Sequence, residues 1–260
     1  MATSAIDYAA ALVAQNSLLA DAFSGADLAS AVPTCPGWSM LQLMRHVGRG
    51  DRWAAQMIRE DVDELDVRAV VDGRPPDDVN LALDWLRASA ALVVAAVAAK
   101  GPGSLVPTFL GRRPGTWWLR RRLHEATVHR ADASLARADA SDFSPYSLEP
   151  HLAADGLDEW LERVIESVEQ GSMSSPLRPG RQLALRCTDL TWGPELWALQ
   201  GTDGGVIRID ATAIAAATLL EGRAEDIFLS LVRRRRIEQT EVLVDGDITV
   251  WQDWLASTPL

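Results

Sequence analysis

Residues 117–132 have the sequence WWLRRRLHEATVHRAD, which predicts one helix carrying two of the four histidines in the chain. Residues four positions apart lie on one face of a helix, so Glu125 and His129 are expected to project together. A carboxylate oxygen and an imidazole nitrogen held in this way can share a metal ion. His124 and His129 are five positions apart, about 140° around the helix, so this is not the zincin pattern of two histidines at i and i+4. Surface Glu–His pairs are common, and the metal hypothesis therefore requires a third ligand elsewhere.

Apolar residues at helical spacing predict four long helices in the first part of the chain, over residues 4–22, 39–59, 78–99 and 116–138. Ser39 is the expected N-cap of the second helix, with Gln42 completing a capping box. Four long helices joined by modest connections predict a helical bundle. A fifth helix over residues 148–169 would close the bundle or link it to the rest of the chain. We therefore expect a four-helix bundle domain over residues 1–170.

The pattern changes after residues 171–180, which have the serine, proline and glycine content of a linker. Beyond it, short apolar and alternating segments predict five strands, over residues 183–188, 195–199, 206–210, 215–220 and 241–244. Helices are expected over residues 223–235 and around Trp251 and Trp254. This second part, residues 181–260, is expected to form a small α+β domain, which makes the whole chain α+β.

The net charge of −11 argues against a nucleic-acid-binding surface, which needs a clustered basic face. The run of four arginines at 233–236 is more simply explained as a helix end with a solvated face. Residues 1–10 lack the basic start of a signal peptide, and no apolar run approaches the ~20 residues that span a bilayer. We therefore expect a cytoplasmic protein without a membrane or nucleic-acid partner. Its two cysteines, Cys35 and Cys187, do not suggest a disulfide framework.

His46, on the second predicted helix, is the candidate third ligand. It lies between the apolar residues Leu43 and Val47 and is expected near the buried face of that helix. Inward-facing glutamate and histidine side chains from different helices build metal sites in bundle cores. A core histidine satisfied by ordinary hydrogen bonds is the alternative. A buried, unpaired carboxylate is costly, so an inward Glu125 needs either an arginine or a metal ion.

Two segments, VPTCPGWSMLQLMRHVGR (32–49) and HEATVHRADA (124–133), resemble the mycothiol-dependent maleylpyruvate isomerase family. Two further segments, LLEGRAEDIFLSLVRR (219–234) and VDGDITVWQDWLA (244–256), also fit the pattern of that family. The resemblance spans nearly the whole chain. It implies a DinB-like metal-binding helical bundle followed by a smaller α+β domain that resembles sterol-carrier protein type 2. The single lysine, Lys100, among 24 arginines is typical of a GC-rich genome such as an actinobacterial one.

Carried over residue by residue, the resemblance implies a divalent metal, normally zinc, held by His46, Glu125 and His129. Three protein ligands leave one coordination position open, as a catalytic zinc site requires. Asp132 could orient the His129 imidazole, or it could be a plain surface charge. The remaining candidates receive no metal role: His124 is expected to be structural or to line the rim, His151 to lie on the surface at a helix start, and Cys35 to be a packed small residue rather than a nucleophile.

The family also implies that the open position takes the thiol of mycothiol, the small thiol of actinobacteria. Only a thiolate is a good nucleophile, and metal coordination deprotonates the thiol. The thiolate would then add to a small electrophilic substrate, giving cis–trans isomerisation if it leaves again and S-transfer if it stays. A metal-dependent hydrolase, or a metal- or thiol-binding regulatory module without turnover, are the alternatives. Arg234 is the candidate anion-binding residue of the second domain, although Arg233 replaces the glycine that precedes this arginine in the family.

Overall fold

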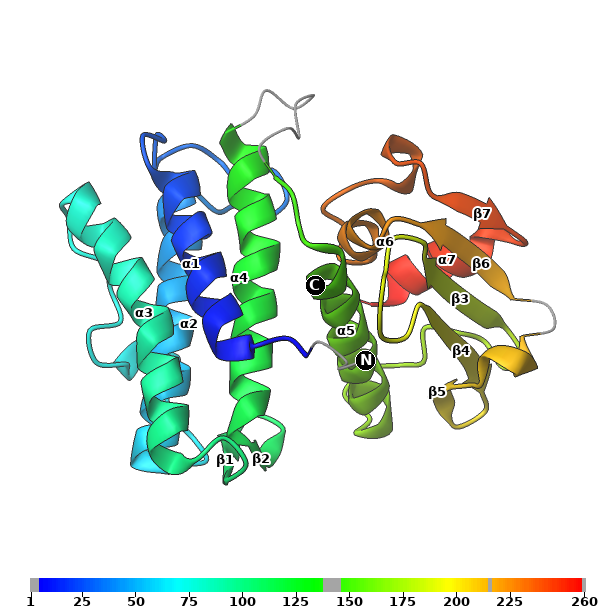
Figure 1. Cartoon of the computed structure of the whole chain (residues 1–260), viewed down its shortest axis with the longest axis horizontal. Coiled ribbons are helices and arrows are strands. Elements are labelled where there is room, and N and C mark those ends of the chain that lie inside the picture. The colour runs from blue at the N-terminus through cyan, green and yellow to red at the C-terminus, as the bar shows by residue number, and fades with distance from the viewer. Residues whose placement is uncertain (1–4, 138–145, 215–216, 259–260) are drawn as a thin grey trace. The chain divides into compact units, whose positions relative to one another are not determined.

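Four long helices form the N-terminal part of the fold: α1 (Tyr8–Phe23), α2 (Met40–Glu60), α3 (Val79–Lys100) and α4 (Gly115–Arg137) (Figure 1). The structure is a computed structural model and describes residues 5–137, 146–214 and 217–258. It divides into two units, Ile6–Tyr146, here called the helical unit, and Ser147–Leu260, here called the sheet unit. The four predicted helices are confirmed, but the first begins at Tyr8, because Asp7 caps it, and not at residue 4. Residues 4 and 138 lie outside the described residues.

The start of α2 is set by the predicted capping box. Ser39 Oγ accepts a hydrogen bond from the Gln42 backbone N–H at 3.3 Å, and the Gln42 side chain accepts one from the Ser39 N–H at 2.8 Å. The helix then turns its apolar stripe toward the bundle core. The fully buried members of that core include side chains from α1, α2 and α3, among them Leu19, Phe23, Leu43, Met44, Val47 and Leu86.

Gly48 lets α2 approach α3 closely. A Cβ atom at this position would lie only 2.2 Å from the Trp85 ring of α3. Trp85 in turn donates through its Nε1 to the Asp72 carbonyl at 2.9 Å, which ties the loop between α2 and α3 to the bundle. That loop was predicted from its acidic composition, and it contains a short 3-10 helix, η1 (Val67–Ala69).

A small hairpin precedes α4. It pairs β1 (Leu105–Thr108) with β2 (Gly111–Pro114) in antiparallel register. The sequence predicts only a short apolar piece and a turn here, because two four-residue strands are too short for a clear alternating pattern. Trp118 on α4 anchors the hairpin by donating its Nε1–H to the Pro107 carbonyl at 2.8 Å.

The helix α3 is long and apolar enough to cross a membrane by length and composition, contrary to the expectation that no such segment exists. Half of its most apolar window is buried inside the fold. Its buried side chains, Leu83, Trp85, Leu86, Val93 and Val97 among them, belong to the bundle interior. Core helices of soluble proteins also pass the length and composition test, so this helix is weak evidence for a membrane span.

The sheet unit contains a five-stranded sheet with the strand order β5-β4-β3-β6-β7 (Figure 1). Its strands are β3 (Gln182–Cys187), β4 (Leu196–Thr202), β5 (Gly205–Arg208), β6 (Thr218–Gly222) and β7 (Leu243–Asp245). β3 and β6 run parallel, and the other neighbours are antiparallel. All five predicted strands are present, although residues 215–216 of the fourth lie outside the described residues. The predicted helices become α6 (Ala224–Leu231) and α7 (Ile248–Ser257).

The fifth helix, α5 (Pro150–Glu169), belongs to the sheet unit rather than to the bundle. It packs against α6 and β5. Its Asp158 accepts hydrogen bonds from Trp197 of β4 at 2.8 Å and from Arg208 of β5 at 2.6 Å. The two compact units of the structure therefore divide between residues 146 and 147, whereas the sequence predicts a division into 1–170, a 171–180 linker and 181–260. An amphipathic pattern shows that a helix has a buried face but not which core covers it.

Candidate metal centre

Three side chains from two helices of the helical unit converge on one point. Glu125 Oε2 lies 3.4 Å from His129 Nε2 on the same helix, α4, as expected for an i, i+4 pair. It also lies 3.5 Å from His46 Nε2, which α2 supplies. One ligand atom from each of the three residues lies within 4.8 Å of the others. The fold thus brings together the predicted trio of His46, Glu125 and His129.

These separations fit a bound zinc ion. Zinc binds imidazole nitrogen and carboxylate oxygen at about 2.0–2.2 Å in tetrahedral geometry, which separates neighbouring donor atoms by about 3.4 Å. Both oxygen–nitrogen separations in the trio match this value. The donor set of two neutral nitrogens and one carboxylate oxygen also suits zinc. The residues therefore fit the ion that the family resemblance implies.

Asp132 positions His129 from behind. Its Oδ2 lies 2.8 Å from His129 Nδ1, and the carboxylate is fully buried. An imidazole that donates its Nδ1 proton to a carboxylate keeps Nε2 deprotonated and available to a metal. The buried position excludes the alternative that Asp132 is a plain surface charge.

Asp132 is itself held by the loop that precedes α2. Thr34 donates its hydroxyl to Asp132 Oδ1 at 2.5 Å, and the Cys35 thiol lies 3.4 Å from Oδ2. Cys35 also hydrogen-bonds His129 and packs against the bundle core. Cys35, expected to be a packed small residue, is thus also part of the hydrogen-bonded shell around His129.

Trp38 lies beside both imidazoles. Its ring centroid is 4.8 Å from that of His46 and 6.4 Å from that of His129, and the second pair is stacked. The Trp38 backbone is tied to the same loop, because its N–H donates to the Cys35 carbonyl at 3.0 Å and its carbonyl accepts from Val32 at 2.9 Å. The tryptophan therefore covers one side of the trio with an apolar surface.

Two arginines of α4 surround the carboxylate of the trio. Arg121 is hydrogen-bonded to Glu125 Oε1, and Arg122 Nη1 lies 4.0 Å from Oε2. Arg122 is buried and donates through Nε to the fully buried Asp51 at 2.6 Å. Gly50 permits this approach, because a Cβ there would lie 2.7 Å from the Arg122 guanidinium. Because Arg121 binds Oε1, the other oxygen of Glu125, Oε2, faces the two histidines.

The charges of the trio are set by these neighbours. Burial opposes ionisation of Glu125, but Arg121 and hydrogen bonds with His129 and His46 hold the pKa of this carboxyl well below its usual range. Burial also disfavours a charged His129, yet hydrogen bonds with Asp132, Cys35 and Glu125 raise the pKa of its imidazole well above its usual range. These hydrogen bonds therefore favour the protonated form of His129, which can pair with two carboxylates. A divalent cation would replace that proton.

The solvent exposure of three histidines can be compared with what the sequence predicts. His46 is more exposed than predicted, with 43% of its side chain accessible, so the trio can be reached from solvent. His124 is buried outside the trio, in agreement with a structural role. His151 is buried and not on the surface as predicted, because α5 packs into the sheet unit, where its Nε2 lies 3.0 Å from Thr191 Oγ1.

Arg234 belongs to the sheet unit and is buried, with Nη1 donating to the Val232 carbonyl at 2.8 Å. Arg233 has a φ of +56°, so the chain keeps the left-handed conformation that favours glycine at this position. Arg235 pairs with Glu225 and Asp226. The arginine run is therefore largely engaged within its own unit, whereas a fully solvated face was expected.

Sequence reasoning gave no role to Thr34, Trp38 or Arg121, although all three contact the trio or its support. Thr34 and Trp38 stand inside the TCPGW segment that carried the family resemblance. Arg121 stands four residues before Glu125, which is a recognisable i, i+4 ion-pair signal.

The sequence comparison gives one family match. Residues 9–134 match the family described as "Mycothiol maleylpyruvate isomerase N-terminal domain". This range covers most of the helical unit. All three residues of the trio, together with Asp132, lie inside the matched range. No curated protein is detectably similar to the chain.

The fold of the whole chain is also that of a solved protein. A crystal structure of the mycothiol-dependent maleylpyruvate isomerase matches 93% of this chain and 93% of its own, with a TM-score of 0.54 and 16% sequence identity. At this identity the likeness establishes the fold alone. It confirms the predicted α+β class, in which a maleylpyruvate isomerase-type bundle is followed by a small α+β domain.

Proposed function

We propose that His46, Glu125 and His129 bind one divalent metal ion, with zinc as the best fit, and that the chain is a mycothiol-dependent enzyme acting on a small electrophilic substrate. One observation carries the proposal: two imidazole Nε2 atoms converge on a single oxygen of Glu125 at 3.4 and 3.5 Å. The description of the matched family and the name of the structurally similar isomerase both contain the word mycothiol, which supports the choice of thiol.

The ion would supply one chemical effect, because coordination lowers the pKa of a thiol and so provides thiolate at neutral pH. The protein residues supply the rest. Asp132 keeps His129 in the tautomer that presents Nε2, and Arg121 holds one oxygen of Glu125 so that the other faces the histidines. Trp38 excludes water from one side of the trio. The exposed edge of His46 leaves a path by which thiol and substrate reach the centre.

The proposed reaction begins with addition of the mycothiol sulfur to an electrophilic carbon of the substrate. If the carbon–sulfur bond breaks after rotation about the former double bond, the result is cis–trans isomerisation. If the bond remains and a leaving group or proton shift completes the reaction, the result is S-transfer. Arg234 is our proposed binding residue for an anionic group of the substrate or thiol, because its planar fork matches carboxylates.

The test combines metal analysis with turnover. Purified protein should hold about one zinc ion per chain after loading. It should isomerise maleylpyruvate only when mycothiol is present and without net loss of thiol, or consume mycothiol when an S-acceptor such as a haloarene is present. His46→Ala should lose both the ion and the turnover. His151→Gln is the matched control, since this histidine stands outside the trio, and it should retain both. Failure of the wild-type protein to bind zinc would refute the site. Stoichiometric zinc without thiol turnover or metal-dependent hydrolysis across a substrate panel would favour a binding module.

A further inference from the structure

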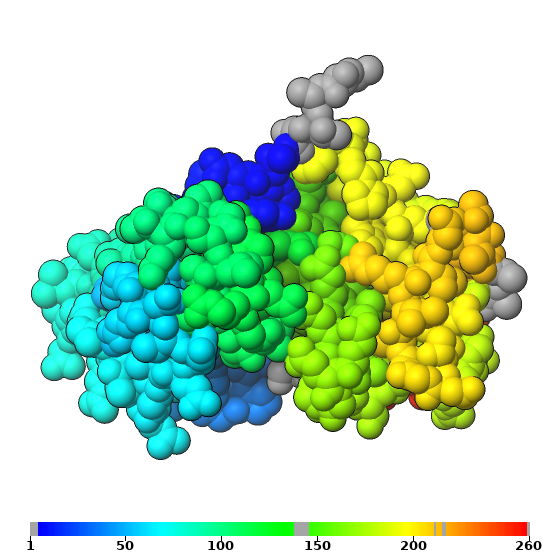
Figure 2. All heavy atoms as spheres, turned by 90° about the horizontal axis from the view of Figure 1, so that it is seen from below, coloured from blue at the N-terminus to red at the C-terminus, as the bar shows by residue number. Residues whose placement is uncertain are grey.

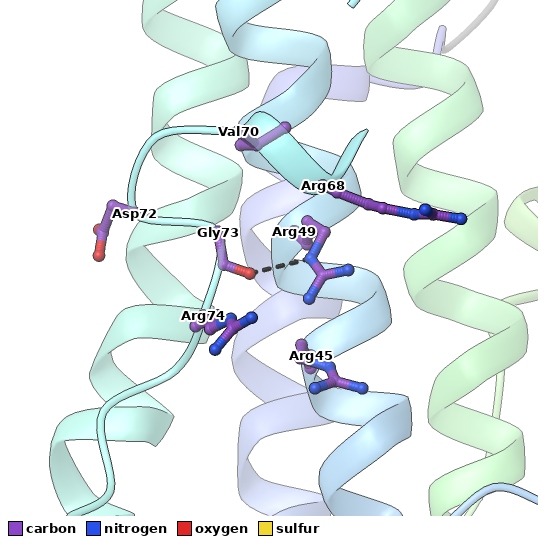
Figure 3. Close-up of a pocket in the computed structure, with 7 residues that line it drawn as sticks. All are labelled: Arg45, Arg49, Arg68, Val70, Asp72, Gly73 and Arg74. Atoms are coloured by element: carbon purple, nitrogen blue, oxygen red, sulfur yellow. Dashed lines mark hydrogen bonds between the residues drawn. The ribbon is translucent and has the colours of Figure 1, made fainter. Parts of the chain in front are cut away.

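A second polar site lies elsewhere in the helical unit. A cavity of about 570 Å³ opens between α2 and the loop that joins α2 to α3 (Figure 3). Four arginines line it together with three other residues of the loop: Arg45, Arg49, Arg68, Val70, Asp72, Gly73 and Arg74. We call this cavity the arginine pocket. Its volume lies within the range of small-molecule binding sites.

The four arginines of the pocket have no carboxylate within 4.0 Å among the residues that the structure describes, in contrast to many other arginines of the chain. The one acidic lining residue, Asp72, pairs with Arg52 outside the pocket at 2.8 Å. Its carboxylate points away from the arginines in Figure 3. Asp66, two residues before Arg68, accepts the Arg68 backbone N–H at 2.8 Å instead of binding a guanidinium.

Helix α2 places Arg45 and Arg49, and the loop fixes Arg49. Arg45 and Arg49 are four residues apart on α2 and so lie on one face of the helix. Arg49 donates its Nε–H to the Gly73 carbonyl at 3.0 Å. The loop turns tightly at Gly73, since a Cβ there would lie 2.9 Å from the carbonyl oxygen of Val70 in the same loop.

The arginines repel one another. Burial, followed by the charges of Arg45 and Arg74, lowers the pKa of Arg49. An arginine remains protonated under these conditions, so the repulsion persists as an unfavourable field inside the cavity. A bound anion would remove it and would be held by charge-assisted hydrogen bonds, which are shorter and stronger than neutral ones.

The surroundings favour a small ligand over a nucleic acid or an anionic membrane. Eight acidic residues lie within residues 60–78, on the same stretch of chain as Arg68 and Arg74. This stretch, coloured cyan, lies on the surface of the helical unit in Figure 2. An extended polyanion would meet this acidic rim, whereas a compact anion inside the cavity would contact the guanidinium groups and avoid it.

We propose that the arginine pocket binds a small polyanion that carries at least two phosphate or carboxylate groups. Guanidinium forks match both groups bidentately. One group would sit among Arg45, Arg49 and Arg74, and the other would face Arg68, whose side chain lies on the other side of Arg49 in Figure 3. The proposal does not depend on the metal centre, because none of the pocket residues belongs to the trio.

Calorimetric titration of the full chain tests this with two probes, tripolyphosphate and citrate. Arg68→Gln/Arg74→Gln removes two exposed arginines of the pocket. Arg59→Gln/Arg87→Gln removes the same charge from two positions outside it and serves as the control. We expect saturable one-to-one binding, weakened at least about tenfold in the pocket variant and within about twofold of wild type in the control. Thermal melting of each variant without ligand shows that both remain folded.

The two probes identify the ligand chemistry. Tighter binding of tripolyphosphate assigns the pocket to phosphate compounds, and tighter binding of citrate assigns it to polycarboxylates. Three results would overturn the proposal. The first is no saturable binding of either probe, and the second is an equal loss in both double variants. The third is a pocket-dependent affinity for a single-stranded oligonucleotide that exceeds that for both small probes.

Discussion

Asp132 Oδ2 lies 2.8 Å from His129 Nδ1 and is fully shielded from solvent. The opposite nitrogen of the same imidazole lies 3.4 Å from Glu125. One imidazole thus connects a buried carboxylate to the candidate metal position. The arrangement is that of a metal-ligating histidine whose orientation and basicity are controlled by a second carboxylate.

Asp132→Ala should weaken zinc binding by about 10- to 100-fold, because the His129 ring loses the group that fixes its tautomer. A competition titration with a chromophoric zinc chelator would measure the change. Asp84→Ala is the control, since Asp84 is exposed on α3 and pairs with Arg87. Unchanged zinc affinity in Asp132→Ala would mean that this carboxylate does not support a metal ligand.

The metal-free protein should lose stability as the pH rises above about 6.5 and through the pKa of folded His129. The pKa of folded His129 is well above its usual range, through hydrogen bonds that outweigh burial. The unfolded imidazole titrates near 6.5, so the stabilisation is fully present below about pH 6.5 and is lost as pH rises through the folded pKa. Melting temperatures of metal-free protein should fall over this range.

Zinc should reverse that dependence. The ion binds neutral imidazole and releases a proton, so zinc affinity and zinc stabilisation increase with pH until His129 is deprotonated. The difference in melting temperature between loaded and metal-free protein is therefore expected to widen from pH 6 to pH 9. A constant difference would contradict the coupling between protonation and metal binding at His129.

Asp51→Ala should reduce the free energy of unfolding by about 3–5 kcal/mol, because it leaves a buried arginine charge uncompensated. Asp51 is fully buried and accepts from Arg122 Nε at 2.6 Å. Urea denaturation would measure the loss. The double variant Asp51→Leu/Arg122→Met should recover most of it, since neither charge is then buried. A loss below about 1 kcal/mol in the single variant would show that water reaches Arg122.

Arg233 combines a strained backbone with favourable contacts. Its φ of +56° costs about 1–2 kcal/mol for a residue other than glycine. Its guanidinium donates to the carbonyls of Leu255 and Thr258 at the end of α7. Arg233→Ala removes the contacts and keeps the strain, whereas Arg233→Gly removes both. Arg233→Gly should therefore be more stable than Arg233→Ala by about 1 kcal/mol in urea denaturation. Equal stabilities would indicate that the strain is absent.

Cys187 should be unreactive in the folded protein. Burial, helped by the charge of Asp189, raises the pKa of its thiol to about 12, and the side chain is almost inaccessible. Only the thiolate reacts appreciably with alkylating reagents and aromatic disulfides. Titration with such a disulfide at pH 8 should modify at most one thiol per native chain and two after denaturation. Cys187→Ser, which leaves Cys35 alone, should not change the native count.

Much of the fold could be predicted because its signals are local. The start of α2 follows from a capping box between Ser39 and Gln42, which act across one helical turn. The pairing of Glu125 with His129 follows from the pitch of a single helix. The short hairpin before α4 was missed because strands of four residues carry too little pattern. The place of α5 in the sheet unit could not be predicted, because its apolar pattern indicates a buried face but not which core that face packs against.

The metal trio was predictable in part from local signals and depended in part on the packing of whole helices. Sequence by itself determined two of its three members, because Glu125 and His129 are neighbours on α4 whatever the helix packs against. The third, His46, was a candidate because it lies beside apolar residues of its helix, and the family resemblance implies the same residue. Only the packing of α2 against α4 brings His46 Nε2 to 3.5 Å from Glu125. Tertiary structure alone also decided that Thr34 and Cys35 contact Asp132. It likewise decided that Arg68 and Arg74 of the loop line one cavity with Arg45 and Arg49 of α2. Periodicity reports interactions within an element, whereas contacts across about a hundred residues depend on how whole elements pack.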